Sequence, residues 1–203
     1  DPRVRVYVND GRQHLQMQAP GTFDLITLEP PPIAYAGVAA LYSMEFYELA
    51  RSRLTSHGFV SQWLPTYQVP TTTALSMIRA FIDVFPQSVL LSGAQADLLL
   101  VGTRGDTIEL DPDRIATALD NRPAVHEDLT RLDLGSVREI AGMFVGSASR
   151  LKGATSSRTP LTDDWPFSEY SVLSALNPGE DVPATVVDLR QLPEWCPRCF
   201  VDG

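Results

Sequence analysis

The stretch that decides the fold is residues 23–47, FDLITLEPPPIAYAGVAALYSMEFY. It opens with a short apolar run, residues 23–28, of the kind found in a parallel sheet that is covered on both faces. Glu29 follows directly, at the carboxyl end of the predicted strand, which is the edge where open α/β sheets bind ligands. Residues 30–32 are prolines, and they stop the strand because proline lacks an amide donor and fixes φ.

An amphipathic helix is predicted after the proline loop. Ser43 has the hydroxyl side chain of an N-cap, and His57-Gly58 would end the helix through a C-terminal glycine. The apolar residues that recur at helical spacing are Phe46, Leu49, Ala50 and Leu54. The deciding stretch is therefore a strand, a rigid loop and a helix.

Strands and helices alternate on both sides of this stretch. Upstream, valines alternate with other side chains from Val4 to Val8 and predict a strand, which Asn9-Asp10-Gly11 ends before a short helix over residues 12–18. Downstream, the predicted elements are a strand over residues 59–64, a helix over 73–85, and strands over 88–92 and 97–102, which residues 93–96 join as an antiparallel hairpin. This order predicts an α/β fold.

The composition limits the classes of function. A chain of 203 residues with 44% apolar residues can form one domain with a sizeable core. The net charge of −9 argues against a nucleic-acid surface, which needs clustered lysine and arginine. No apolar run approaches the length that spans a bilayer. The sequence opens on Asp1-Pro2 without an initiator methionine, so we expect a piece of a longer protein.

Together these pieces resemble the spermidine synthase family of aminopropyltransferases, and especially its divergent bacterial members fused to membrane transporter-like regions. The resemblance rests on DPRVRVYVNDGRQHL, FDLITLE and LYSMEFYELARSRLTSHG, and it extends to about Gly105. It implies a Rossmann-like, methyltransferase-type sheet that ends in an antiparallel hairpin over residues 1–105. Residues 106–203 would then be a mostly helical and irregular C-terminal extension with a proline-rich tail.

The resemblance also implies ligands and roles for particular residues. The ligands would be S-adenosylmethionine, its decarboxylated form or methylthioadenosine, with group transfer to an amine. Asp10, followed by Gly11, matches the family acid that contacts the adenine amino group; alternatively it caps the next helix. Glu29 matches the acid that serves as base or amine anchor; alternatively it is a solvated acid at a strand end. Gln62 matches a glutamine near the reacting groups; alternatively it is a core residue that bonds the backbone.

The chain departs from the family pattern in two respects. The sequence contains no G-x-G, so neither the glycine-rich cofactor loop nor the strand that ends in a ribose-binding acid is present. The second acid of the family's D-x-x-D-P pattern falls on Pro32, which cannot accept a hydrogen bond from an ammonium group. We therefore expect the sheet to lack its first two strands and the chain to be inactive by itself.

Missing strands would also leave edges unpaired. The strand over residues 4–8 and the strand that ends at Glu29 each lose a neighbour, so we expect a homodimer or strand exchange. We expect a cytoplasmic location, with membrane association through a membrane-embedded partner region upstream. The alternative to an enzyme is a non-catalytic assembly or ligand-sensing module beside that membrane partner.

The second half of the chain carries weaker signals. A helix is predicted over residues 111–119, with Asp111 as its cap and Pro112 at its first position. A second helix is predicted over residues 136–149, and a strand over 184–189. The segment TDDWPFSEY resembles one near the end of the same transporter-fused proteins, and its Asp163 and Asp164 could bind a cation or simply be solvated. The motif WCPRC could be half a zinc site, a redox pair or two ordinary thiols. The three histidines are distant in sequence, so we expect no metal site.

Overall fold

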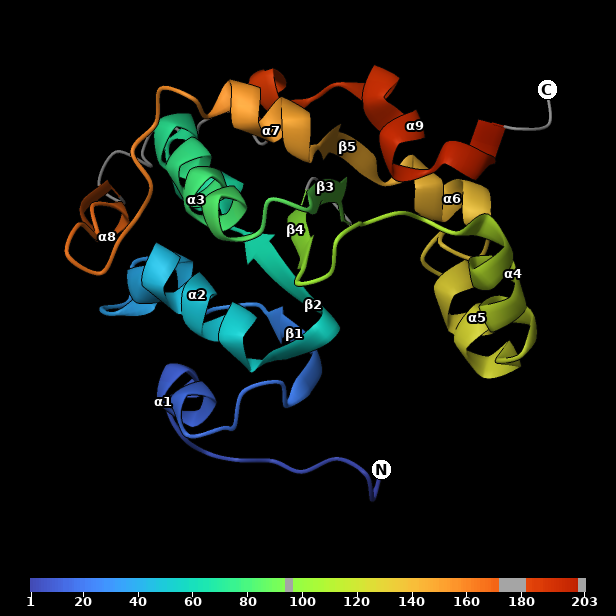
Figure 1. Ribbon diagram of the computed structural model, residues 1–203, viewed down its shortest axis with the longest axis horizontal. Helices are drawn as coiled ribbons and strands as arrows, with labels where there is room; N and C mark the ends of the chain where they lie inside the picture. The colour runs from blue at the N-terminus through green and yellow to red at the C-terminus, as the bar shows by residue number, and fades with distance from the viewer. Residues whose placement is uncertain (94–96, 172–181, 201–203) are drawn as a thin grey trace.

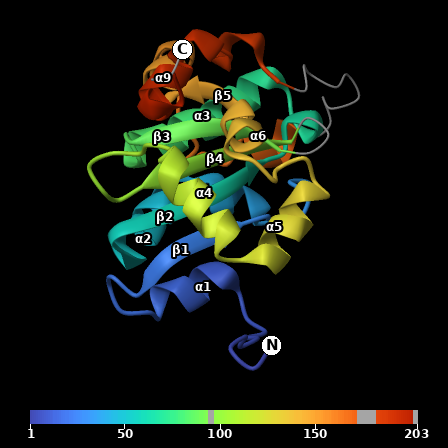
Figure 2. The same cartoon turned by 90° about the vertical axis from the view of Figure 1, so that its right-hand side faces the viewer.

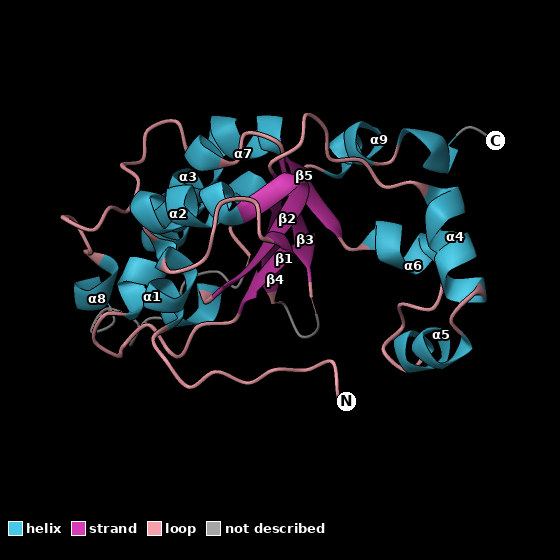
Figure 3. Cartoon of the chain, turned by 60° about the horizontal axis from the view of Figure 1, so that its bottom comes forward, coloured by secondary structure: helices cyan, strands magenta, loops and turns pink. Residues whose placement is uncertain are grey.

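The computed structural model describes residues 1–93, 97–171 and 182–200. Within them, five strands form one mixed sheet in the order β1-β2-β4-β3-β5, with helices on both sides (Figures 1 and 3). The strands are β1 (Phe23–Leu28), β2 (Leu54–Leu64), β3 (Ser88–Ser92), β4 (Leu98–Thr103) and β5 (Phe144–Ser147). The predicted α/β class and methyltransferase-type sheet are confirmed.

The deciding stretch folds as a strand, a loop and a helix. β1 runs parallel to β2, and a 3₁₀ turn, η1 (Val38–Tyr42), leads into α2 (Met44–Arg53). The predicted N-cap at Ser43 is confirmed, because its hydroxyl oxygen accepts a hydrogen bond from the Phe46 amide at 3.2 Å. Phe46 and Ala50 are buried against the sheet, as the helical spacing predicted.

The end of α2 differs from the prediction. The helix stops at Arg53, and the chain enters β2 at Leu54, so His57 and Gly58 lie within a strand and do not cap the helix. Leu54 pairs with Phe23, and Phe59 to Leu64 pair with β4 on the other side. At the other end of the stretch 54–58, the Gly58 carbonyl oxygen accepts hydrogen bonds from the Arg104 amide and the Thr103 hydroxyl. These long-range contacts hold residues that local spacing had assigned to the helix.

The hairpin and the helix before it follow the prediction closely. α3 (Thr71–Val84) packs on β4, and β3 pairs antiparallel with β4. Gly102 makes close packing possible here, because a Cβ at this position would lie 2.8 Å from the Cβ of Phe85. Phe81 and Phe85 are fully buried, and each contributes roughly 1.5–3 kcal/mol by leaving water. The predicted turn over residues 93–96 lies largely outside the described residues.

The predicted strand at Val4–Val8 is wrong. These residues form an exposed segment without strand pairing, which runs beyond α1 (Gly11–Gln16) at the N-terminal end of the molecule (Figure 2). Alternation predicts a strand only where a partner supplies hydrogen bonds, and the described residues offer none at this place. The prediction that β1 is covered on both faces is also wrong, since Leu25 is 59% exposed.

The C-terminal half contributes to the sheet, contrary to the helix predicted over residues 136–149. That stretch divides into α6 (Val137–Gly142) and β5, and β5 pairs antiparallel with β3. Phe144 explains the change, because its ring stacks on Trp195 with centroids 5.8 Å apart, and both are buried beside Val89. The predicted strand over residues 184–189 is wrong, because the 3₁₀ turns η5 (Ala184–Val186) and η6 (Leu189–Gln191) form there.

The remaining elements surround this frame. Asp111 caps α4 (Pro112–Asp120), as predicted, by accepting bonds from the amides of Asp113 and Arg114. The other elements are η2 (Thr66–Gln68), α5 (Pro123–Thr130), α7 (Ala148–Ala154), α8 (Ser168–Ser171), α9 (Leu192–Trp195) and η7 (Pro197–Phe200). Within the described ranges, no helix is long and apolar enough to cross a membrane.

The WCPRC motif forms a disulfide. Cys196 and Cys199 are joined by a 2.03 Å S–S bond, so of the alternatives the half-site for zinc is excluded in this state. Arg198, between them, forms ion pairs with Asp111 and Asp113 and ties the tail to α4. No group of three or more histidine, cysteine or acidic side chains among the described residues could hold a metal ion.

Candidate functional site

Glu29 lies where the sequence placed it, immediately after β1 at the carboxyl end of the sheet. Leu28, the residue before it, is paired with Gln62 on the parallel strand β2. The Glu29 side chain is exposed, and within the described part of the chain its carboxylate has no hydrogen bond or ion pair. A free carboxylate at this edge can bind an ammonium group or accept a proton from one.

Gln62 presents a buried amide behind this edge. Its side chain is fully buried, and its Nε2 donates to the Trp63 carbonyl oxygen at 3.1 Å, as the core alternative predicted. Its Oε1 nevertheless has no hydrogen-bond partner in the described ranges of the chain. A buried acceptor without a partner costs free energy unless a water molecule or a ligand satisfies it.

Two tyrosines of the α2 region share this environment. The hydroxyl groups of Tyr42 and Tyr47 are buried and, like Gln62 Oε1, have no partner with hydrogen-bond geometry among the residues that the structure describes. Burial raises the pKa of Tyr42 well above its usual range, and the neighbouring Gln62 amide opposes that rise. Burial also raises the pKa of Tyr47, and the adjacent Tyr42 adds to the effect. Both tyrosines therefore remain neutral hydrogen-bonding groups at physiological pH, a polar role that their helical spacing gave no reason to expect.

Asp10 and Gly11 stand at the start of α1. The Asp10 carboxylate caps this helix by accepting a hydrogen bond from the Gln13 amide at 2.8 Å, so the capping alternative is what the structure contains. Asp10 is exposed, and Gly11 is the first residue of the helix. One carboxylate oxygen accepts the capping bond, which leaves the second for another donor.

The proline loop after Glu29 is held by two long-range hydrogen bonds. The Ile33 amide donates to Gln68 Oε1 at 3.2 Å, and the Gly37 amide donates to Glu169 Oε1 at 2.8 Å. Gly37 has φ of 84°, which a residue with a side chain adopts at a cost. Pro32 is exposed in this loop, so the position of the second family acid faces solvent without a carboxylate.

Asp163, which the sequence left as either a cation ligand or a solvated acid, is neither. Its carboxylate accepts hydrogen bonds from Arg12 at 2.8 and 2.5 Å and from the Ser43 hydroxyl at 2.7 Å. The Arg12 guanidinium holds the pKa of Asp163 below its usual range, and Ser43 adds to this effect. Asp163 and Glu169 both belong to the segment TDDWPFSEY. Through these two side chains the segment is hydrogen-bonded to α1, to the N-cap of α2 and to the proline loop. No sequence signal links Arg12 to a residue so far along the chain.

The comparisons with known proteins bear on the fold. No family model matches the sequence, and no curated protein matches it. Among solved structures, the chain is similar to a probable spermidine synthase from Corynebacterium glutamicum ATCC 13032, at 17% identity and a TM-score of 0.50. That alignment covers 80% of this chain and 55% of the other.

Two further solved structures match less well. The spermidine synthase from Thermotoga maritima is 20% identical with a TM-score of 0.44, over 57% of this chain and 41% of that one. A spermidine synthase in complex with the transition state analogue AdoDATO is 20% identical with a TM-score of 0.45, over 57% and 42% of the two chains. The chain thus has a spermidine-synthase-like fold, as the resemblance predicted, and spans about half the length of these proteins.

Proposed function

We propose that this chain supplies the amine-side half of a transferase site that takes an S-adenosylmethionine-type nucleoside as its other ligand. The single observation that carries the proposal is the Glu29 carboxylate, which stands exposed and unpaired at the carboxyl end of β1, beside the strand that carries Gln62. In a spermidine-synthase-like fold this edge is the expected place for a reacting amine.

The proposed roles follow from the donor and acceptor capacity of each group. Glu29 would hold an ammonium group or take its proton, so that the nitrogen lone pair can attack the carbon next to the sulfonium. As the C–N bond forms, the bond from that carbon to sulfur breaks, and the nucleoside leaves as a neutral thioether that keeps the electron pair. The free Oε1 of Gln62 would accept a hydrogen bond from the amine or from a water molecule that bridges to it. Asp10 would accept a hydrogen bond from the adenine amino group with its second carboxylate oxygen while it caps α1.

We further propose that the chain alone does not turn over an aminopropyl donor. Pro32 supplies no second acid, and the sequence contains no G-x-G loop for the nucleoside. The expected result is binding without turnover. Formation of spermidine from putrescine and decarboxylated S-adenosylmethionine by this chain would contradict this expectation.

Calorimetry with three ligands tests the binding proposal: S-adenosylmethionine, its decarboxylated form and methylthioadenosine. Asp10→Ser is the informative variant, because serine keeps the cap on α1 and removes the carboxylate. Loss of nucleoside binding in Asp10→Ser, with unchanged thermal stability, supports contact with the ligand. Binding that survives in Asp10→Ser and fails only in Asp10→Ala would assign Asp10 to the cap alone.

A non-catalytic assembly module is the second candidate, and the open edge of β1 favours it. Among the described residues, β1 pairs with β2 alone, and Leu25 and Phe59 are exposed by 59% and 40% on the uncovered part of the sheet. Exposed strand edges with apolar neighbours recruit other chains. Calorimetry that detects no binding of any of the three nucleosides, together with self-association of the chain, would favour this candidate over the transferase.

A further inference from the structure

A second concave site lies at the opposite end of the sheet from Glu29. It has a volume of about 410 Å³ and is lined by residues of α2, by the end of α3 and by the residue that follows β4. Arg104 marks its position, since the Arg104 amide donates to the Gly58 carbonyl oxygen at 3.0 Å, near the start of β2. Gly58 and Gln62 are four residues apart on β2, or about 13 Å at the usual rise of a strand. The groove is thus separate from the edge that carries Glu29.

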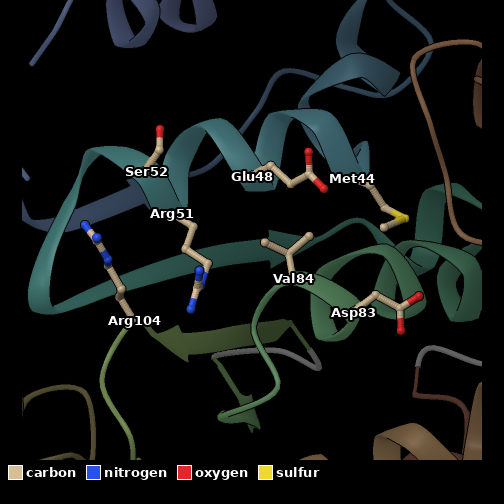
Figure 4. Close-up of a pocket in the computed structure, with 7 residues that line it drawn as sticks. All are labelled: Met44, Glu48, Arg51, Ser52, Asp83, Val84 and Arg104. Atoms are coloured by element: carbon tan, nitrogen blue, oxygen red, sulfur yellow. The ribbon is translucent and has the colours of Figure 1, made fainter. Parts of the chain in front are cut away.

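Two arginines reach into this groove from different elements, Arg51 from α2 and Arg104 from the segment after β4 (Figure 4). Arg51 has no ion pair and no side-chain hydrogen bond within the described residues. Arg104 donates from Nη1 to the Leu54 carbonyl oxygen at 2.5 Å, which orients its guanidinium and leaves other N–H groups free. The groove therefore holds two positive charges with unused donors, and a hydrogen bond orients one of them, Arg104.

Among the described residues, neither acid of the groove forms an ion pair with Arg51 or Arg104. Asp83 lies in the wall, but its carboxylate accepts a hydrogen bond from Arg79 Nε at 2.7 Å and is already paired. Glu48 is the other acid, and no ion pair joins it to Arg51 or Arg104 among the described residues. Met44 and Val84 give the groove an apolar section beside these charges (Figure 4).

We propose that this groove binds a small molecule through an oxyanion head group, a phosphate or a carboxylate, held between Arg51 and Arg104. The positive charges of Arg51 and Arg104 repel each other, whereas an anion bound between them attracts both. Guanidinium groups match the oxygens of both head groups, and hydrogen bonds between ions are stronger than neutral ones. The volume is within the usual range for a small-molecule site.

Phosphate suits the arrangement better than carboxylate. The two guanidiniums come from different elements, and a tetrahedral anion offers oxygens in more than one plane, whereas a carboxylate offers two in one plane. We expect inorganic phosphate to bind more tightly than succinate at low ionic strength. Tighter binding of succinate would support the same groove and assign it to carboxylates.

The test is a titration of the chain with inorganic phosphate and with succinate, followed by NMR of backbone amides and arginine Nε groups. Arg51→Gln should weaken phosphate binding about tenfold or more, because it removes charge-assisted hydrogen bonds. Arg51 supports no other group, so this variant leaves the fold intact. Glu48→Gln should tighten binding, since it removes a negative charge from the groove.

Arg138→Gln is the matched control. Arg138 is an exposed arginine on α6, away from the groove, and its loss changes the net charge equally. Unchanged affinity in this control supports a defined site. Equal weakening in Arg51→Gln and Arg138→Gln, or no shift of groove resonances at millimolar phosphate, would overturn the proposal.

Discussion

Arg12 and Asp163 are 151 positions apart in the sequence and form a two-pronged ion pair, with Nη1–Oδ1 and Nη2–Oδ2 distances of 2.8 and 2.5 Å. Asp163 also accepts from Ser43, the N-cap of α2, and its own amide donates to Glu45 Oε2 at 3.0 Å. One carboxylate therefore joins the first helix, the start of the second and a loop of the C-terminal half.

The first prediction concerns the strength of this junction. Asp163→Ala should lower the free energy of unfolding by about 1–2 kcal/mol, because Arg12 and Ser43 lose the carboxylate and keep only the Ala40 carbonyl oxygen as acceptor, while the site is partly exposed to solvent. Asp164→Ala is the control, since Asp164 is exposed and has no contact within the described residues. Urea denaturation should show a change within about 0.5 kcal/mol for the control. Equal losses for the two variants would refute a special role for Asp163.

The second prediction concerns pH. The pKa of Asp163 is lowered in the folded state by Arg12, so the pair stabilises the fold above the unfolded pKa of about 3.9. This contribution disappears as the pH falls through the lower folded pKa. We therefore expect the denaturation midpoint, measured from about pH 6 to about pH 2, to decrease once the pH is below about 4. The decrease should be less steep in Asp163→Asn. A parallel pH profile in that variant would show that other groups carry the acid sensitivity.

The third prediction concerns association. The open edge of β1 and the exposed Leu25 beside it should bring two copies together, which we propose as the dimer that the unpaired strands imply. Leu25→Lys should shift the chain to a monomer in sedimentation experiments, because it places a charge on the contact surface. Leu132→Lys is the control, since Leu132 is 67% exposed beyond α5. A parent chain that sediments as a monomer at micromolar concentration, with freely exchanging amides in β1, would contradict this prediction.

The fourth prediction concerns the disulfide. Cys196 and Cys199 close a very short loop, so reduction should lower the free energy of unfolding by only about 2 kcal/mol. The Arg198 ion pairs with Asp111 and Asp113 hold the same tail and should persist after reduction. Denaturant curves with and without dithiothreitol measure the difference, and Cys199→Ser reproduces the reduced state. Global unfolding on reduction would show that the tail organises more of the fold than these contacts indicate.

The sequence by itself determined the elements whose signals are local. The strand Phe23–Leu28, the cap at Ser43 and the cap at Asp111 depend on side chains within a few residues of each other, and all three are present. The position of Glu29 at a sheet edge follows from the same local order of strand and prolines. Such features are readable because their interactions are formed by neighbours in the chain.

Only the tertiary structure decided the features that need a distant partner. The chain enters β2 at Leu54, which pairs with Phe23 of β1, whereas Val4–Val8 has the better strand pattern and no pairing partner among the described residues. Two further features depend on how helices pack against distant segments. They are the buried Tyr42 hydroxyl, which has no hydrogen-bond partner among the described residues, and the groove that Arg51 lines. The physical reason is that strand pairing, burial and charge pairing are properties of which surfaces meet, and periodicity along one segment carries no information about its partner.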